Sequence, residues 1–442
     1  MYKRIWVGVV ATGLLAVALQ AQAGISFQAA VATHYQPGPG GQNLPPDDFV
    51  TSQVVLDARS ISVTSPGRTA VFDFASRRRY DVDLKAGTYV DYSLFDTVGF
   101  RVMEVQSRAN IRKMLAAAKV ETPAFDPVFD EQSLSILSQQ GRALTEASDG
   151  ADTVLSVDGK PLLRFGAGGV PVGADDAAAF ARYVRYQFGG HPLVLAKLAS
   201  LGRVPDKFVM YYREVGGSQT RTFTISGLKP SSAAVYDLAR YKERVGGADE
   251  IDQLLDRARA TRVPTDADRI KFEAQQDAAF AEKRGLDLML GAVEWSLMTG
   301  AQMQPFSADR QALLQSDPAV RTVSGSLKPR DKASLAAAAQ VMKTMQPQTM
   351  NKRHVLQLFE ANDRIQLGER AAALPLYASV LRANPALAGA YKDMGDALIV
   401  GFDMPRGWRS WDQGRRIAPQ LNLFEAVNQF EQKLVRDHPE YF

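Results

Sequence analysis

Apolar and polar residues alternate through the segment from Val54 to Leu94. The alternating runs are separated at Ser65-Pro66-Gly67 and Lys85-Ala86-Gly87, which have the composition of turns. A period of two places successive side chains on opposite faces of a strand. The pattern therefore predicts a meander of antiparallel strands with one apolar face. The residues expected on this face are Phe72, Phe74, Tyr80, Val82, Leu84, Val90, Tyr92 and Leu94.

Aspartates occupy the alternate positions of these strands. They are Asp73, Asp81, Asp83 and Asp91. We expect them on a solvated face of the sheet, and a paired-carboxylate active site is the alternative. If the domain encloses a cavity for an apolar ligand, the aromatic residues of the other face should line it. The candidate ligand-binding residues are Phe72, Phe74, Tyr80 and Tyr92.

The rest of the first half mixes helices and hairpins. Helical periodicity runs from Phe95 to Lys119, and Asp158-Gly159 and Gly216-Gly217 each mark the turn of a hairpin. Between the hairpins, one helix should end at Gly189-Gly190 and a second should open at His191-Pro192. Residues 24–245 therefore predict one α+β domain, with helices packed against a curved antiparallel sheet.

From residue 246 to residue 442 the pattern is helical throughout. We expect two long helices within 247–300 and a loop-rich interval over 305–330. Further helices are expected over residues 331–345, 351–367, 370–383, 386–400 and 423–437. The fold class predicted for the whole chain is α+β, with an all-helical, repeat-like C-terminal domain.

The first 23 residues have the composition of a secretory signal peptide. Lys3 and Arg4 precede an apolar run from Ile5 to Leu19, and Ala21-Gln22-Ala23 is a small-x-small cleavage site. A membrane anchor is the alternative, but a spanning helix needs about 20 apolar residues. We expect cleavage after Ala23, no membrane span afterwards, and a soluble protein in the periplasm, with secretion as the alternative.

Composition excludes several kinds of chemistry. The chain contains no cysteine, so thiolate metal sites, cysteine nucleophiles, disulfides and a lipidated cysteine are impossible. The net charge of +4 falls to +2 when Lys3 and Arg4 are removed, and no basic stripe with interleaved aromatics is present. We therefore expect no binding to nucleic acid. The four histidines lie far apart in sequence, and we expect no metal or other cofactor.

His191 is the most plausible catalytic candidate, because Gly189 and Gly190 would bring backbone close to it. The structural alternative is an N-terminal cap that joins two helices. The motif Ser226-Gly227-Leu228-Lys229 matches S-x-x-K, but Pro230 argues against the helix that a serine–lysine pair requires.

Residues 351–419 carry the spacing of a helical repeat. Pro385 would end one unit, and Ala373 and Tyr377 fall at the small and aromatic positions of its second helix. Tyr391, Met394 and Gly395 then open the next unit. This segment resembles tetratricopeptide repeats, which implies antiparallel hairpins with a concave binding face. A departure at residues 401–411 interrupts the second unit, and a generic helical hairpin is the alternative.

The first half resembles the LolA-like periplasmic carrier fold in the order of its elements. The signal peptide, the meander, the helix after it and the later hairpins carry this resemblance. It implies a half-open antiparallel barrel, closed by helices over an apolar cavity.

Trp408 and Trp411 follow the repeat-like segment in a stretch broken by proline and glycine. They should either cap the helical stack or anchor a partner. We expect a non-catalytic binding or adaptor protein of the bacterial envelope, whose helical domain binds another envelope protein or peptide. The sheet would bind a lipid or an apolar small molecule as a further ligand. The alternative is a periplasmic hydrolase with a site near His191.

Overall fold

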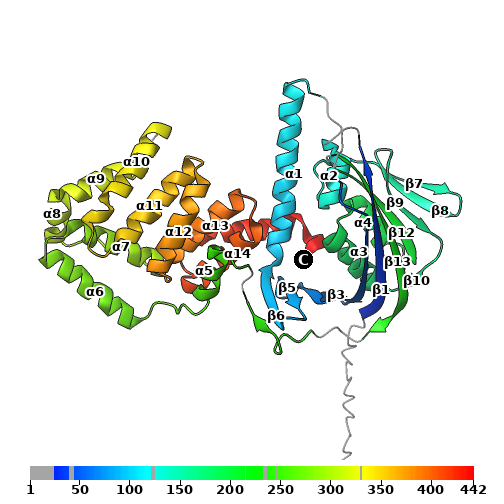
Figure 1. The fold of residues 1–442 in the computed structure, drawn as a ribbon, viewed down its shortest axis with the longest axis horizontal. Helices are drawn as coiled ribbons and strands as arrows, with labels where there is room; N and C mark the ends of the chain where they lie inside the picture. Colours follow the sequence, from blue (N-terminus) through cyan, green and yellow to red (C-terminus); the bar gives the residue numbers. More distant parts are fainter. Residues whose placement is uncertain are drawn as a thin grey trace, which may run out of the picture.

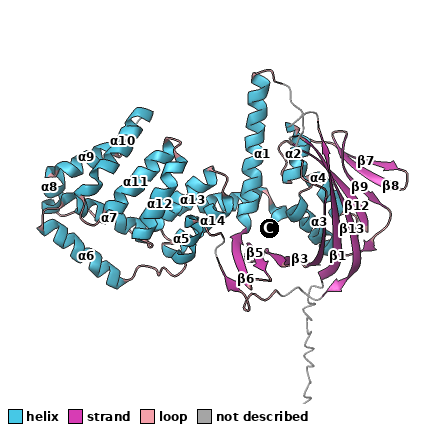
Figure 2. Ribbon diagram, in the orientation of Figure 1, coloured by secondary structure: helices cyan, strands magenta, loops and turns pink. Residues whose placement is uncertain are grey.

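The computed structural model describes residues 24–38, 44–120, 125–214, 216–231, 236–244, 247–328 and 331–442. The expected signal peptide, residues 1–23, lies outside the described residues. The fold is α+β: strands dominate the first half and helices the second (Figure 2).

One sheet of 12 strands forms the frame of the first half, in the order β14-β6-β5-β4-β3-β2-β1-β13-β12-β9-β8-β7. It is antiparallel except for the β14–β6 pair, and it curves around α3 and α4 (Figure 1). Its strands are β1 Gly24–Pro37, β2 Asp48–Leu56, β3 Ser60–Ser65, β4 Arg68–Asp73, β5 Arg78–Asp83, β6 Thr88–Ser93, β7 Leu144–Asp149, β8 Asp152–Val157, β9 Lys160–Gly166, β12 Lys207–Glu214, β13 Gly217–Ser231 and β14 Lys242–Glu243. Strands β10 Val170–Pro171 and β11 Arg203–Val204 pair separately.

Both predicted hairpins are present, but Gly217, expected in the turn of the second, belongs to β13. Val157 pairs with Lys160 across Asp158-Gly159, and Glu214 pairs with Gly217. Asp158 and Gly159 have φ of 49° and 76°, as a turn with two left-handed central residues requires. The helices of this half are α1 Leu94–Ala117, α2 Pro127–Leu134, α3 Ala174–Phe188 and α4 Pro192–Ala199.

The predicted single apolar face of the meander is wrong. Phe72 lies opposite Arg79, and Arg79 lies opposite Tyr92, whereas Tyr80 lies opposite Asp91. Directly paired residues share a face of the sheet. Phe72 and Tyr92 are therefore on one face, and Tyr80 is on the other beside an aspartate.

Loop length explains this arrangement. Four residues separate Asp73 from its partner Arg78, and four separate Asp83 from Thr88. With loops of this length, even-numbered residues of one strand share a face with odd-numbered residues of the next. Alternation within each strand was interpreted correctly, but β5 was assigned the opposite orientation. Leu84, expected inside, is exposed.

The second half is helical, and its helices are more numerous than predicted. Residues 247–300 contain three helices instead of two, and the interval expected to be loop-rich contains α8 and α9. The helices are α5 Glu250–Ala258, α6 Asp266–Ala281, α7 Gly285–Thr299, α8 Ala308–Ser316, α9 Pro318–Ser326, α10 Lys332–Met345, α11 Arg353–Gln366, α12 Arg370–Ala383, α13 Ala388–Val400, α14 Met404–Ile417 and α15 Glu425–Asp437.

Two successive hairpins, α11–α12 and α13–α14, repeat the same spacing. The first helix begins at residue 353 and then at residue 388, and the second begins at 370 and then at 404. Ala373, Tyr377 and Gly395 are buried, as predicted. The expected interruption at 401–411 is wrong, because Pro405 occupies the first turn of a regular α14, where its missing N–H costs nothing.

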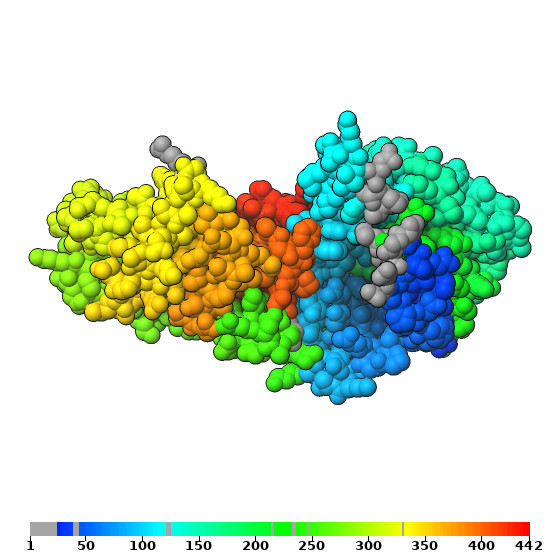
Figure 3. All heavy atoms as spheres, turned by 45° about the horizontal axis from the view of Figure 1, so that its top comes forward, coloured from blue at the N-terminus to red at the C-terminus, as the bar shows by residue number. Residues whose placement is uncertain are grey.

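The two halves meet where α14 packs against α1 and β6. The C-terminal segment lies between them, in orange and red against the cyan of α1 (Figure 3). Tyr441 is fully buried; its backbone oxygen accepts a hydrogen bond from Tyr186 at 2.8 Å, and its hydroxyl accepts one from Arg101 at 3.0 Å. Residues from the end of the chain therefore complete the core of the sheet domain.

Candidate binding site

The predicted ligand-binding residues of the sheet do not form one site. Phe72 and Phe74 are 5% and 8% exposed and pack against Tyr186 of α3, with ring centroids 4.9 and 5.7 Å away. Tyr80 lies on the other face beside Tyr236, at 5.5 Å. Tyr92 lies between the guanidinium groups of two arginines on the first face. Phe72 and Phe74 are therefore core residues that fix the sheet to α3.

Trp408 and Trp411 are buried, at 0% and 5% exposure. The indole N–H of Trp408 donates to Glu431 at 2.9 Å, and that of Trp411 donates to Asp396 at 3.1 Å. A Cβ atom at Gly99 of α1 would lie 2.4 Å from the Trp408 ring. Neither tryptophan is exposed as a partner anchor would be. Trp411 packs against Gly395 of α13, and Trp408 joins the helical half to α1.

His191 caps α4, as the structural alternative expected. Its Nδ1 accepts a hydrogen bond from the backbone N–H of Leu193 at 3.2 Å, and its Nε2 lies 2.9 Å from Glu131. Burial alone would raise the pKa of Glu131, but hydrogen bonds from His191, Arg142 and Ser138 outweigh it and lower this pKa to about 2. His191 is fully buried, so neither ring nitrogen is accessible to a substrate.

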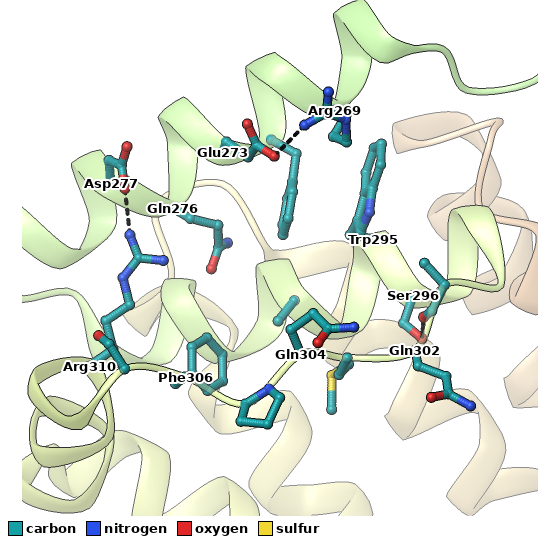
Figure 4. Close-up of a pocket in the computed structure, with 16 residues that line it drawn as sticks. Arg269, Glu273, Gln276, Asp277, Trp295, Ser296, Gln302, Gln304, Phe306 and Arg310 are labelled. Atoms are coloured by element: carbon teal, nitrogen blue, oxygen red, sulfur yellow. Dashed lines mark hydrogen bonds and ion pairs between the residues drawn. The ribbon is translucent and has the colours of Figure 1, made fainter.

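A pocket of about 710 Å³ lies in the helical half, between α6, α7 and the segment 301–307 (Figure 4). Phe272 of α6 and Trp295 of α7 stack in one wall, with ring centroids 4.9 Å apart and planes within 9°. Phe306 lies across from them. Both stacked rings are partly exposed, so they offer an apolar surface to a ligand.

Gln276 provides a polar group inside this pocket. Its side chain points from α6 into the space between Trp295 and Phe306 (Figure 4). The residue is only 4% exposed, and its amide oxygen has no hydrogen-bond partner among the described residues. Gly291 makes room for this amide, because a Cβ atom there would lie 2.2 Å from the Gln276 nitrogen. A buried amide oxygen without a partner favours a ligand that can donate a hydrogen bond to it.

The rim of the pocket is charged but balanced. Arg269 pairs with Glu273 at 2.7 Å, and Arg310 pairs with Asp277. The wall formed by residues 302–304 has no regular secondary structure, and its backbone makes no hydrogen bond to another described residue. Because its charges are paired, the rim favours neither a positively nor a negatively charged ligand. The backbone donors and acceptors of the wall remain free to bind a ligand.

A polar cluster holds the helices behind the pocket. Glu294 of α7 accepts hydrogen bonds from Lys352 at 2.6 Å and Asn384 at 2.5 Å, and it lies 2.6 Å from Nε2 of His354. Burial alone would raise the pKa of Glu294, but His354 and Lys352 lower it to about 2. The ionised carboxylate thus ties α7 to α11 and to the turn after α12.

This pocket was not predicted from the sequence. Only two long helices were expected within 247–300, the second of which would carry both Phe272 and Trp295, whereas α6 ends at Ala281 and α7 begins at Gly285. The signal was Lys283-Arg284-Gly285: Lys283 has φ of 56°, which breaks the helix and lets α7 fold back on α6. Only that reversal brings the two rings together.

Within the described ranges, no group of His, Asp and Glu side chains is arranged to hold a metal ion. None of the described helices combines the length and apolarity needed to cross a membrane. No protein-family model matches the sequence, and a comparison with curated proteins finds no match.

Proposed function

We propose that this protein is a non-catalytic binding or adaptor protein of the bacterial cell envelope, and that its helical domain binds an extended peptide segment of another envelope protein. The observation that carries this proposal is the pocket at α6–α7. It combines a stacked aromatic pair with a buried amide oxygen that has no partner among the described residues, and with a backbone segment, residues 302–304, that makes no hydrogen bond to one. An apolar side chain of a peptide fits against the stacked aromatic pair. The backbone N–H and C=O groups of a peptide fit the amide of Gln276 and the backbone of residues 302–304.

The repeated hairpins support the same proposal. The spacing of α11–α14 and the burial of Ala373, Tyr377 and Gly395 favour similarity to tetratricopeptide repeats, a class that commonly binds peptides and proteins. The proposed similarity of the sheet domain to LolA-like carriers rests on a curved sheet closed by helices. Its aromatic residues Phe72 and Phe74 are packed core, so we place binding in the helical domain.

Selection from a random peptide library on the protein lacking residues 1–23 tests the proposal. Trp295→Ala should weaken binding of the selected peptides by about tenfold or more, because aromatic anchors dominate such interfaces. Gln276→Leu should weaken it by about fivefold, the loss of one net hydrogen bond. Phe49→Ala, which removes an exposed aromatic of β2, is the matched control and should change nothing.

Two results would contradict the proposal. One is a selection that enriches no peptide; the other is binding that Trp295→Ala leaves unchanged while the variant keeps its thermal stability. The envelope location is tested separately. N-terminal sequencing of the protein from its bacterial host should begin at Gly24, and an intact Met1 in the membrane fraction would contradict it.

A further inference from the structure

A second, smaller cavity lies at the junction of the two halves. It has a volume of about 130 Å³, enough for a few water molecules or one small ion. On one side are β5, β6 and β14 of the sheet domain, and on the other are α5 and α14. Five arginines line it: Arg78, Arg244, Arg259, Arg409 and Arg416.

The three acidic residues of this cavity already have cationic partners. Asp91 accepts a hydrogen bond from Arg78 at 2.7 Å. Asp412 also pairs with Arg78, at 2.7 Å, and with Arg415, at 2.6 Å. Glu243 pairs with Arg259. The arginines of the cavity therefore outnumber its carboxylates, and each carboxylate already forms an ion pair.

Arg409 is the most buried of these five arginines. It is 9% exposed, and its Nη2 makes no hydrogen bond to a described residue. Its nearest carboxylate is that of Asp252, at 3.6 Å, which exceeds a hydrogen-bond length. Its guanidinium carbon lies 5.2 Å from the centre of the Tyr92 ring. Burial holds the pKa of Arg409 below its ordinary value, as expected for a cation removed from water.

Arg416 is exposed and lacks an acidic partner among the described residues. Its guanidinium donates to the backbone oxygens of Ala258, at 3.0 Å, and Thr261, at 2.8 Å. No carboxylate of the described residues lies within 4.0 Å of it. Arg244 is exposed at the mouth of the cavity and has no ion pair within the described chain. The cavity thus holds one buried positive charge, that of Arg409, and two exposed ones, those of Arg416 and Arg244, which have no ion pair within the described chain.

A buried charge without a partner is strongly destabilising, and a bound counter-ion removes that cost. We propose that this cavity is an anion site that binds a phosphate or sulfate group. Guanidinium groups match the oxygens of such groups with paired N–H donors. A doubly charged group is favoured over a carboxylate, because Arg409 has no carboxylate closer than 3.6 Å and neither Arg416 nor Arg244 forms an ion pair with a described residue. The bound group would contact the sheet domain and the helical domain together and so stabilise their docking.

The test is thermal unfolding of the protein lacking residues 1–23 in inorganic phosphate, in sulfate, and in sodium chloride or acetate at matched ionic strength. Phosphate or sulfate at tens of millimolar should raise Tm by about 2–4 °C over chloride. Acetate should raise it less. Glycerol 3-phosphate distinguishes a free phosphate ion from a phosphate group carried on a larger molecule. If it raises Tm as much as inorganic phosphate or more, the result supports the site and favours a phosphate group on a larger molecule as the natural ligand.

Arg409→Met separates this site from general salt effects. Without phosphate the variant should be at least as stable as the natural protein, because it removes a buried charge whose nearest carboxylate lies 3.6 Å away. With phosphate it should gain nothing. Arg244→Gln changes an exposed residue and should weaken the phosphate response about threefold, which keeps the test decisive if Arg409→Met folds poorly. Arg436→Met, at a side chain 72% exposed, should respond as the natural protein does.

The proposal is overturned if the natural protein shows no phosphate-specific rise in Tm. It is also overturned if Arg409→Met and Arg244→Gln both respond fully to phosphate. An acetate effect equal to that of phosphate would overturn the preference for a doubly charged group.

Discussion

Gly395 offers the sharpest test of how the repeat-like hairpins pack. It lies in the middle of α13, where α14 crosses it closely: a Cβ atom would lie 2.4 Å from Cδ1 of Trp411 and 3.0 Å from the backbone oxygen of Gly407. In a helix interior, replacing glycine by alanine ordinarily stabilises by about 0.5–1 kcal/mol. Overpacking of a tight core costs about 1–3 kcal/mol. We expect the clash to prevail, so that Gly395→Ala lowers the free energy of unfolding by about 1–2 kcal/mol.

The matched control is Gly325→Ala. Gly325 is also helical, near the end of α9, and a Cβ atom there would meet nothing within 4 Å. This variant should be neutral or stabilised by up to about 0.5 kcal/mol. Equilibrium urea unfolding, followed by tryptophan fluorescence and by far-UV circular dichroism, measures both. If Gly395→Ala stabilises the protein as much as the control does, the close crossing of α13 and α14 is wrong.

Three further predictions address other parts of the molecule. Phe74→Ala should cost about 3–5 kcal/mol in urea unfolding, because its ring is buried against α3, and a cost below about 1 kcal/mol would indicate a cavity instead. Trp408→Ala should lower Tm and speed proteolysis between the halves, since its ring fills the space over Gly99; unchanged cleavage would contradict this role. Burial, and to a smaller extent the charge of Glu360, raise the pKa of Asp363 from 3.8 to about 6. Between these pH values the folded state binds more protons than the unfolded state, so the folded state loses stability as pH rises. Asp363→Asn should therefore stabilise by about 1–3 kcal/mol near pH 8 and by nothing below about pH 3.8, in urea unfolding at both pH values.

Local chemistry made much of the chain predictable from sequence. The hairpin at Asp158-Gly159 follows from two residues that tolerate a left-handed backbone, and the break before Pro192 follows from glycine and proline. The apolar spacing of Ala373, Tyr377 and Gly395 likewise predicted which side chains would be buried. In each case the residues that decide the structure lie within a few positions of one another.

Errors arose where the outcome depends on residues far apart. Tyr80 alternates correctly within β5, but the loops on either side put it on the opposite face from Phe72 and Tyr92. Trp408 was open to two interpretations, and its contact with Gly99, more than 300 positions away, decided between them. The stacked pair of Phe272 and Trp295 exists because α7 folds back on α6.

The sequence by itself therefore determined the order and type of the elements, the turns and the buried face of most helices, because hydrophobic periodicity and backbone preferences act locally. The tertiary structure decided which strand faces coincide, how the C-terminal segment joins the two halves, and where charges remain unpaired. Arg409 illustrates the difference. Nothing in its neighbours along the chain distinguishes it from other arginines, and only the packing of α14 against β6 removes it from water without supplying a close carboxylate.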